Sequence, residues 1–416
     1  MGVSPSPGQL TAMNRNVRLL RVYVTSLMLT PFLAVWVVYL TDFRELTLTQ
    51  VAIMEAFFWA VSMLAEIPSG AFADRFGRKS TFLVGVTLEG IGVFSFGLAS
   101  NFELLTASYV LWASGIAFGS GNAQAFLYET MKAGGRAEGY AKQQGRLQAI
   151  MMTSSMVGAA SGAFVAAWLD LQAPVLLGAA FYVVAFVVAL RLDEPPRDEE
   201  QLVAASSYLA TLRAAAGFLR SHAPVRFVIL FSIATGVASM TEWLLMQPFL
   251  ASHNVPIGLF GLIAIPVRLS SVLGALGGAQ IVEWLGIRRT VVSSFVLTLG
   301  GLVTLATVDH VGALFGVMAI AVAGAFRQPA VWAYINDRTS SSMRATVLSV
   351  TPFGMSASFA LLFPFIGLAS DEGIRLGFAV LLGVVTAAAG LSLVLWLKAD
   401  AGADPPAVLR PEPVTS

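Results

Sequence analysis

Residues 70–80 read Gly-Ala-Phe-Ala-Asp-Arg-Phe-Gly-Arg-Lys-Ser, a short segment with three cations and one anion. The segment lies between two apolar stretches, about 49–69 and 80–100, and each is long enough to cross a bilayer, which takes roughly 20 residues. A degenerate copy lies half a chain later, from Gly278 to Arg289. The two copies indicate a membrane protein built by duplication, and we expect such a protein to be a transporter.

The composition also indicates a membrane protein. Of the 416 residues, 56% are hydrophobic and 12% are charged, whereas a soluble domain has roughly 25% charged residues. The formal net charge of +1 argues against a nucleic-acid partner, because binding the phosphate backbone needs a concentrated basic surface. The chain has no cysteine, which excludes a disulfide framework, a thiolate nucleophile and a cysteine metal site.

Twelve apolar segments between residues 19 and 397 are predicted to span the lipid bilayer. Their orientation follows from the positions of Lys and Arg. With the N-terminus inside, the inner segments hold 21 of the 25 cations, whereas the outer loops hold only Arg44 and Arg375. This asymmetry obeys the positive-inside rule, so we expect a multi-pass protein of the cytoplasmic (inner) membrane with both termini in the cytoplasm.

The spans fall into two groups of six. We predict an all-α integral membrane fold with an N-terminal six-helix bundle at 1–192 and a C-terminal six-helix bundle at 226–398. Residues 193–225 begin with charged residues and continue with leucines at helical spacing, which predicts a cytoplasmic linker with an amphipathic helix. The proline-rich tail at 399–416 is expected to be a disordered cytoplasmic segment.

A shift of 208 or 209 residues lays the second half of the chain on the first. The matched positions are Asp74 with Glu283, Gly77 with Gly286, Glu129 with Asp337, and Arg136 with Arg344. Because these positions fall in equivalent inner loops, they indicate two pseudo-symmetric six-helix bundles related by an axis along the membrane normal. The alternative is that inner loops share basic residues through composition alone.

The charged loop resembles the signature of the major facilitator superfamily, and the resemblance covers essentially the whole membrane region. The matching residues are Gly70, Asp74, Arg75, Gly77, Arg78 and Lys79, and the second-half counterpart consists of Glu283, Gly286, Arg288 and Arg289. The resemblance implies secondary transport by alternating access, with the loop acting as a latch between the halves in the outward-open state. The loop cations could instead serve only as topology anchors.

Three residues give this loop its expected geometry. Gly70 and Gly77 are expected to let the chain turn tightly between packed helices. Asp74, where the second span ends, is expected to accept hydrogen bonds from a neighbouring helix end or to pair with a cation there.

Charged residues inside the predicted spans need a specific reason, because an ionised side chain at a helix centre costs about 2.5–3.5 kcal/mol. The candidate substrate or proton residues are Glu55, Glu89, Asn122, Glu242, Arg268 and Arg327. Glu242 shares one polar stripe of the seventh span with Thr235 and Ser239, and the resemblance places the eighth span, with Arg268, beside it. We interpret the two either as a structural ion pair or as a site for substrate or protons.

The remaining charges have less specific interpretations. Glu89, at the centre of the third span, is either a protonation switch or a satisfied core carboxyl, and Glu55 is either a gate or part of a cavity rim. We expect Arg327 to reach the inner surface by snorkelling. The residues expected to support the inner gate are Glu66, Glu129, Arg136, Asp337 and Arg344, with the two carboxylates at the inner span ends pairing with the two arginines.

The energy source is predicted to be a gradient, because the sequence has no Gly-x4-Gly-Lys-Ser/Thr nucleotide loop. Protonatable glutamates favour proton coupling, and 28 Phe, 14 Met and 8 Trp suit an adaptable apolar cavity. We predict proton-coupled efflux of a lipophilic or amphipathic small molecule by a monomer without a cofactor. An uptake symporter or a facilitator is the alternative, since the arginine of the fourth span and the proline of the fifth span that are typical of antiporters in the family are missing.

An intramembrane enzyme is the distant alternative. The three histidines, His222, His253 and His310, lie in loops, and neither a His-Glu-x-x-His motif nor an Asp-rich metal motif occurs in the sequence. We therefore expect no catalytic residue, no metal site and no enzymatic activity.

Overall fold

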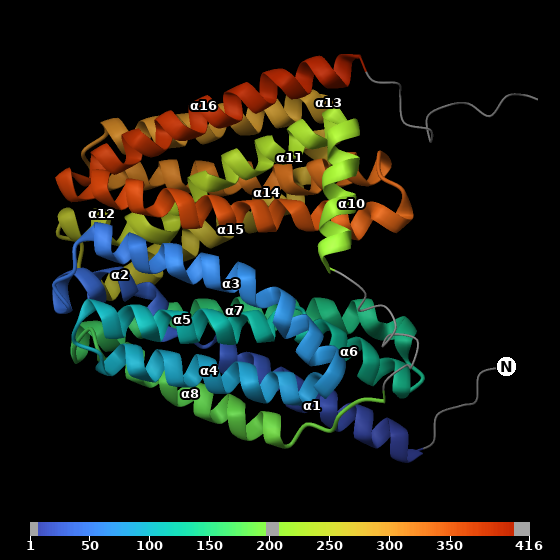
Figure 1. Ribbon diagram of the computed structural model, residues 1–416. Helices are drawn as coiled ribbons and strands as arrows, with labels where there is room; N and C mark the ends of the chain where they lie inside the picture. Colours follow the sequence, from blue (N-terminus) through green and yellow to red (C-terminus); the bar gives the residue numbers. More distant parts are fainter. Residues whose placement is uncertain (1–6, 197–207, 403–416) are drawn as a thin grey trace, which may run out of the picture. The chain divides into compact units, whose positions relative to one another are not determined.

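The computed structural model describes residues 7–196 and 208–402, and every regular element in these ranges is helical (Figure 1). Eleven helices in the described ranges are long and apolar enough to cross a membrane. One of them runs from Ile257 to Thr307 and bends at Gly286, so it supplies two of the predicted spans. The chain therefore has the predicted all-α integral membrane fold with twelve transmembrane helices.

The described residues form two compact units, one from 7–196 with 250–264 and the other from 208–249 with 265–402. In the first half of the chain the helices are α1 (Pro7–Met28), α2 (Trp36–Val38), α3 (Leu48–Phe76), α4 (Arg78–Leu98), α5 (Phe102–Gly119), α6 (Asn122–Ala133), α7 (Tyr140–Trp168) and α8 (Ala173–Leu190). In the second half they are α10 (Tyr208–Ser221), α11 (Ala223–Gly236), α12 (Met246–Ser252), α13 (Phe260–Thr307), α14 (Leu314–Asp337), α15 (Ser341–Glu372) and α16 (Ile374–Ala401).

Local hydrogen bonds fix where two of the spans begin. Thr47 Oγ1 accepts the Gln50 N–H at 3.2 Å, and Gln50 Oε1 accepts the Thr47 N–H at 3.0 Å, which forms a capping box before α3. Asn101 Oδ1 accepts the Leu104 N–H at 2.9 Å at the start of α5. Such caps satisfy N–H groups that have no partner within the helix.

The charged loop is shorter than the sequence predicts, because α3 continues to Phe76 and only Gly77 turns the chain. Gly77 has φ 96° and ψ 169°, a conformation that is essentially restricted to glycine. Gly70 is helical, and no atom lies within 4 Å of the position that a Cβ would take there. The prediction that Gly70 forms part of a tight turn is therefore wrong.

The internal repeat is visible at the corresponding turn of the second half. Gly286 has φ 72° and ψ 161°, close to the values at Gly77. Thr81 Oγ1 donates to the Gly77 carbonyl at 2.6 Å, and Thr290 Oγ1 donates to the Gly286 carbonyl at 2.9 Å. Both pairs of residues are related by the predicted shift of 209, which supports the pseudo-symmetry of the two halves.

Small residues bring neighbouring spans into close contact in both halves. A Cβ on Gly92 of α4 would lie 2.9 Å from the Ser108 carbonyl oxygen of α5. A Cβ on Gly301 of α13 would lie 2.5 Å from the Gly316 carbonyl oxygen of α14. Membrane helices use small residues in this way to let their backbones approach, and the repeat shift relates these two contacts as well.

The first and seventh spans are both interrupted. After α1 the chain forms a 3-10 turn (Pro31–Ala34), the short α2 and a π-helical turn (Tyr39–Phe43). After α11 it forms a 3-10 turn (Val237–Ser239) and a π-helical turn (Thr241–Leu245) before α12. Irregular turns of this kind inside long helices are frequent at functional sites.

The structure also covers part of the predicted linker and tail. The helix of the central stretch is α10, which contacts α11 and α15 and runs across them (Figure 1). α16 continues to Ala401, past the position where the sequence predicts the tail to begin. The rest of the predicted linker and tail, at 197–207 and 403–416, lies outside the described residues.

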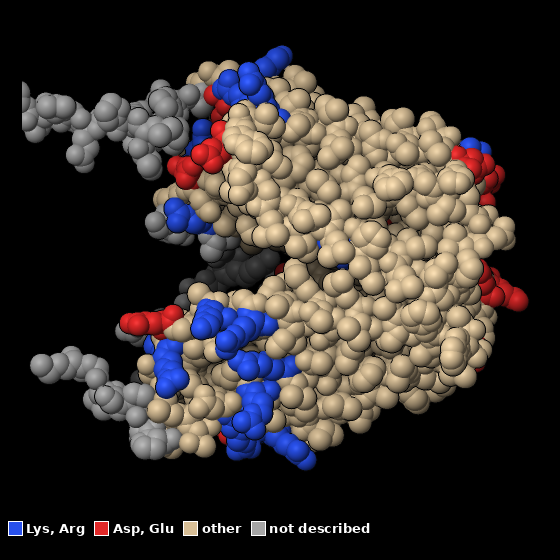
Figure 2. All heavy atoms as spheres, turned by 180° about the vertical axis from the view of Figure 1, so that it is seen from behind, with Lys and Arg blue, Asp and Glu red and all other residues tan. Residues whose placement is uncertain are grey.

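Most charged side chains on the face shown in Figure 2 lie near the ends of the helices. On this face most of the Lys and Arg side chains gather at one end of the helices of each unit, and uncharged surface covers most of the length between the ends. This distribution is what a hydrocarbon layer requires.

Candidate functional site

Two of the loop cations, Arg78 and Lys79, are the first residues of α4, and a carboxylate that follows α8 accepts their backbone N–H groups. The two carboxylate oxygens of Glu194 accept the backbone N–H groups of Arg78 and Lys79, both at 2.7 Å. Lys79 Nζ donates to the Leu190 carbonyl at 2.8 Å. A carboxylate at a helix N-terminus satisfies unpaired N–H groups and interacts favourably with the helix dipole. The end of the sixth span therefore fixes the beginning of the third.

The side chain of Arg78 binds a different helix. Its Nε and Nη2 donate to Glu129 Oε1 of α6 at 3.1 and 2.9 Å. The sequence predicts Arg136 as the partner of Glu129, and this prediction is wrong, because the Arg78 side chain reaches Glu129 whereas the exposed Arg136 lies beyond the end of α6. Asp74 is half-buried in the last turn of α3, and Arg75 stacks on Phe76 at 5.3 Å from the ring centroid.

A small polar cavity of about 190 Å³ adjoins this cluster. Glu66, Ser69, Arg78 and Asn122 are among its lining residues. Asn122 is buried, and its Nδ2 donates to the Arg78 carbonyl at 2.9 Å. Its Oδ1 accepts no hydrogen bond from the described part of the chain. The structure therefore places Asn122 and Glu66 beside the loop motif.

The second half has a corresponding contact, in which Asp400 near the end of α16 takes the place of Glu194. Asp400 accepts the Tyr334 hydroxyl at 2.6 Å, Arg288 Nε at 2.7 Å and Arg338 Nη2 at 3.5 Å, and its side chain is 7% exposed. Arg288 follows Gly286 as Lys79 follows Gly77. In both halves, therefore, the end of the last span binds the first residues of the third.

Glu194 and Asp400 are functional candidates that the sequence analysis missed. Each is an acidic residue that follows the last apolar stretch of its half within a few positions, and this spacing is the one signal that could have identified them. The sequence also predicts that Asp337 pairs with Arg344. Instead, Arg344 Nη2 donates to the Asn336 carbonyl at 3.3 Å, and no ion pair joins these two residues in the described ranges.

Glu242 and Arg268 form an ion pair inside the membrane region, as one of the two interpretations of the sequence requires. Arg268 Nη2 lies 2.9 Å from Glu242 Oε1. Glu242 belongs to the π-helical turn Thr241–Leu245, and Arg268 lies on α13 just after Pro266. The side chains are 55% exposed for Arg268 and 20% exposed for Glu242, so both charges remain accessible.

The other intramembrane carboxylates are enclosed within the first unit. Glu55 is buried, and its Oε2 accepts Trp59 Nε1–H at 3.1 Å. Glu89 is also buried, is hydrogen-bonded to Tyr182 and packs against the backbone of Gly115. These contacts agree with the interpretation of Glu89 as a satisfied core carboxyl.

Arg327 does not reach the surface of its unit. It is 7% exposed, and its guanidinium lies 5.8 Å from the ring centroid of Phe231 on α11. The prediction that Arg327 snorkels is therefore wrong, because the cation lies over an aromatic ring inside the unit. Glu283 is exposed near the end of the first arm of α13.

Comparison with known proteins identifies a family. Residues 22–361 match the model of the Major Facilitator Superfamily. The chain is 26% identical over 300 residues to multidrug resistance protein 1 of Bacillus subtilis (strain 168), which covers 69% of this chain and 72% of that protein. Its fold is similar to that of a mutant of the nucleoside transporter NupG (TM-score 0.74, 15% identity, 92% of this chain and 99% of the other). It is also similar to that of a D-xylose-proton symporter (TM-score 0.64, 12% identity, 94% and 97%).

Proposed function

Because this chain belongs to the Major Facilitator Superfamily, and is therefore a multi-pass membrane transporter that works by alternating access and not an enzyme, we propose that it exports a small molecule in exchange for protons. The exported compound is lipophilic or amphipathic. The transporter acts as a monomer in the cytoplasmic membrane, with both termini in the cytoplasm.

The observation that carries this proposal is the ion pair between Glu242 and Arg268. A guanidinium that is half-exposed within a spanning segment cannot face hydrocarbon without a large cost. The pair therefore borders a water-filled path, where ions and polar groups of a substrate can reach it. Charged residues in such a position are characteristic of substrate and proton pathways.

The chemistry of the pair supports exchange. Protonation of Glu242 removes the negative charge that holds Arg268 at 2.9 Å. A cationic group on a substrate competes with that proton for the same carboxylate. Because the two ligands exclude one another, loading of one requires release of the other, and alternating access then couples their movements in opposite directions.

The irregular backbone around Glu242 supports the proposal that this part of the seventh span changes conformation during transport. The π-helical turn Thr241–Leu245 has i→i+5 hydrogen bonds, and a 3-10 turn precedes it. Interrupted helices in transporters carry the binding groups and the bending points of the alternating-access cycle. Glu242 thus lies on the irregular segment of the seventh span.

Efflux is favoured by the relative that carries the name multidrug resistance protein. A proton-coupled uptake symporter is the second candidate, because a D-xylose-proton symporter and a nucleoside transporter have similar folds. The two candidates differ in the sign of the coupling, since a symporter binds proton and substrate together whereas an antiporter binds them in turn.

Transport driven by an imposed pH gradient tests the proposal. Proteoliposomes with an acidic interior should accumulate a lipophilic cation when protons leave, and an ionophore that collapses the gradient should abolish the accumulation. Glu242→Gln should lose this accumulation, because the neutral amide neither exchanges a proton nor attracts a cationic group. Glu103→Gln, a change at an exposed carboxylate in the first turn of α5, serves as the control.

Two outcomes would contradict the proposal. Accumulation that requires an alkaline interior would identify a symporter. Undiminished coupling in Glu242→Gln would remove Glu242 from the proton path.

The loop motif is proposed to hold the inner ends of the spans together. Glu194 and Glu129 bind the start of α4 in the first unit, which keeps this corner rigid while the transporter changes state. The expected latch between the halves, with Asp74 and Arg75, remains a prediction. Cysteine accessibility at the inner side should increase in Asp74→Asn, and an unchanged pattern would argue against the latch.

A further inference from the structure

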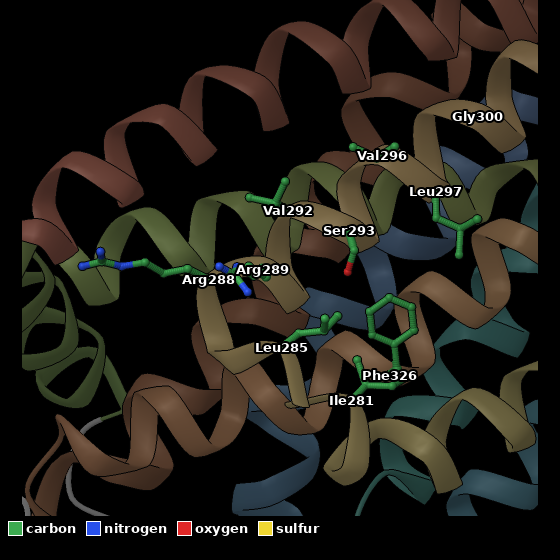
Figure 3. A pocket seen from close by; sticks show the side chains of 10 residues that line it. All are labelled: Ile281, Leu285, Arg288, Arg289, Val292, Ser293, Val296, Leu297, Gly300 and Phe326. Atoms are coloured by element: carbon green, nitrogen blue, oxygen red, sulfur yellow. The ribbon is translucent and has the colours of Figure 1, made fainter. Parts of the chain in front are cut away.

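The second unit has an apolar groove that the transport proposal does not use. The groove has a volume of about 960 Å³ and lies between the two arms of α13, at 260–285 and 287–307, and α14 (Figure 3). Its apolar wall consists of Ile281, Leu285, Val292, Val296, Leu297 and Phe326. Gly300 is the last lining residue on the second arm of α13. No atom lies within 4 Å of the position that a Cβ would take at Gly300.

The groove is polar at one end only. Figure 3 shows Arg288 and Arg289 at the end of the row that continues through Val292 and Val296 to Gly300. Ser293 is the remaining polar residue of the lining, and its hydroxyl donates to the Thr290 carbonyl at 3.0 Å. The groove therefore offers two cations followed by a continuous apolar surface.

The two arginines retain hydrogen-bonding capacity for a ligand. Arg288 uses Nε to bind Asp400, but its side chain is about half-exposed. Arg289 is exposed and has no carboxylate partner in the described part of the chain. Glu283 is the nearest acidic residue along α13 that is also exposed, and it does not line the groove. An arginine guanidinium with free N–H groups suits a phosphate, which it can bind through two parallel hydrogen bonds.

The length of the groove matches one leaflet of a membrane. From Arg289 to Gly300 the helix rises about 16 Å at about 1.5 Å per residue. The hydrocarbon core of a bilayer is about 30 Å thick, so this distance is close to the depth of one leaflet. Val296 is 62% exposed, and Leu285 and Leu297 are also exposed, so the wall is open to the lipid and is not covered by its own unit.

We propose that this groove binds an anionic phospholipid of the cytoplasmic leaflet. The phosphate lies on Arg289 and Arg288, and one acyl chain lies along Val292, Val296 and Gly300. The charge complementarity, the apolar wall and the match in length each support a lipid with a negative headgroup. The proposal requires that the end of the groove with Arg288 faces the cytoplasm. It does not depend on the direction of transport or on whether transport is coupled to protons.

The absence of cysteine from the chain allows a direct test in the full-length protein. Ser293→Cys carries a fluorophore inside the groove, and brominated acyl chains quench it on contact. Brominated phosphatidylglycerol should quench this probe at a severalfold lower mole fraction than brominated phosphatidylcholine with the same chains. Leu391→Cys, on an exposed lipid-facing position of α16, should be quenched equally by both lipids.

Two further variants separate the headgroup from the chain. Arg289→Gln in the labelled protein should reduce the preference for phosphatidylglycerol by about fivefold, since one arginine near an anionic membrane surface contributes about 1 kcal/mol. Arg18→Gln, at an exposed arginine of α1, should leave the preference unchanged. Val296→Trp fills the groove and should abolish quenching by either lipid at Ser293→Cys.

Three results would overturn the proposal. Equal quenching by the two lipids at the groove would show that no anionic headgroup is selected. An equal effect of Arg18→Gln and Arg289→Gln would show that the overall charge of the inner surface is responsible. Loss of the preference in excess soluble glycerol phosphate, with quenching unaffected by Val296→Trp, would show a phosphate site without a bound acyl chain.

Discussion

Replacement of Asp400 tests the contact between the end of α16 and the start of the second arm of α13. Asp400→Ala removes the carboxylate that accepts a 2.6 Å hydrogen bond from the hydroxyl of Tyr334. A hydrogen bond to a charged group contributes about 1.5–3 kcal/mol. The Arg288 contact at 2.7 Å involves a half-exposed cation and adds about 0–1 kcal/mol. The 3.5 Å contact with Arg338 adds little.

Together these contacts predict a loss of about 1.5–4 kcal/mol in the free energy of unfolding of the second unit. For a unit of this size the apparent Tm should fall by at least about 3 °C, measured by tryptophan fluorescence on the purified protein. Asp309→Ala removes an exposed carboxylate that lies 3.6 Å from Arg375 and should change Tm by less than about 1 °C. An unchanged Tm in Asp400→Ala, or an equal fall in Asp309→Ala, would refute this reasoning.

Three shorter predictions concern the first half. Gly77→Ala should lower the free energy of unfolding by about 1–3 kcal/mol, because the positive φ at this position strains any residue with a Cβ. Gly70→Ala, at an open helical position, should not lower it. Equal losses of stability in thermal denaturation would contradict the assignment of the turn to Gly77. Gly115→Ala should cost about 1–3 kcal/mol because its Cβ would lie 2.6 Å from the Glu89 backbone nitrogen, and an unchanged Tm would show that α4 and α5 separate easily. Glu194→Gln should increase the hydrogen-exchange rates of the Arg78 and Lys79 amides about two- to fivefold, since a charge at a helix N-terminus contributes about 0.3–1 kcal/mol; unchanged rates would exclude the cap.

The fold and the repeat could be predicted from the sequence because the membrane constrains it so strongly. Twelve long apolar segments and a one-sided distribution of cations leave few alternatives. Gly77 and Gly286 occupy equivalent positions in the two halves because the same turn occurs in both. The structure shows nearly the same backbone conformation at the two glycines. The pairing of Glu242 with Arg268 could also be anticipated, since charges inside spans need partners.

The contacts of Glu194, Asp400 and Glu129 at the helix ends could not be predicted, because they depend on where each helix stops. The sequence shows the acidic residues Glu194 and Asp400 but not that α16 remains helical through Asp400 and brings it to Arg288. Glu129 has cations near it in sequence, but Arg78 reaches it from another helix. The position of Arg327 near one end of its span predicts a surface location, whereas in the structure its guanidinium is buried near the ring of Phe231.

The central claim is that Glu242 exchanges a proton for each cationic substrate that crosses the membrane. Proton release measured with a pH-sensitive dye, in lightly buffered proteoliposomes during transport of a lipophilic cation, tests it most directly. The wild-type protein should move about one proton in the direction opposite to the substrate, and in Glu242→Gln addition of the substrate should release no proton. Proton movement in the same direction as the substrate, or exchange that persists in Glu242→Gln, would contradict the claim.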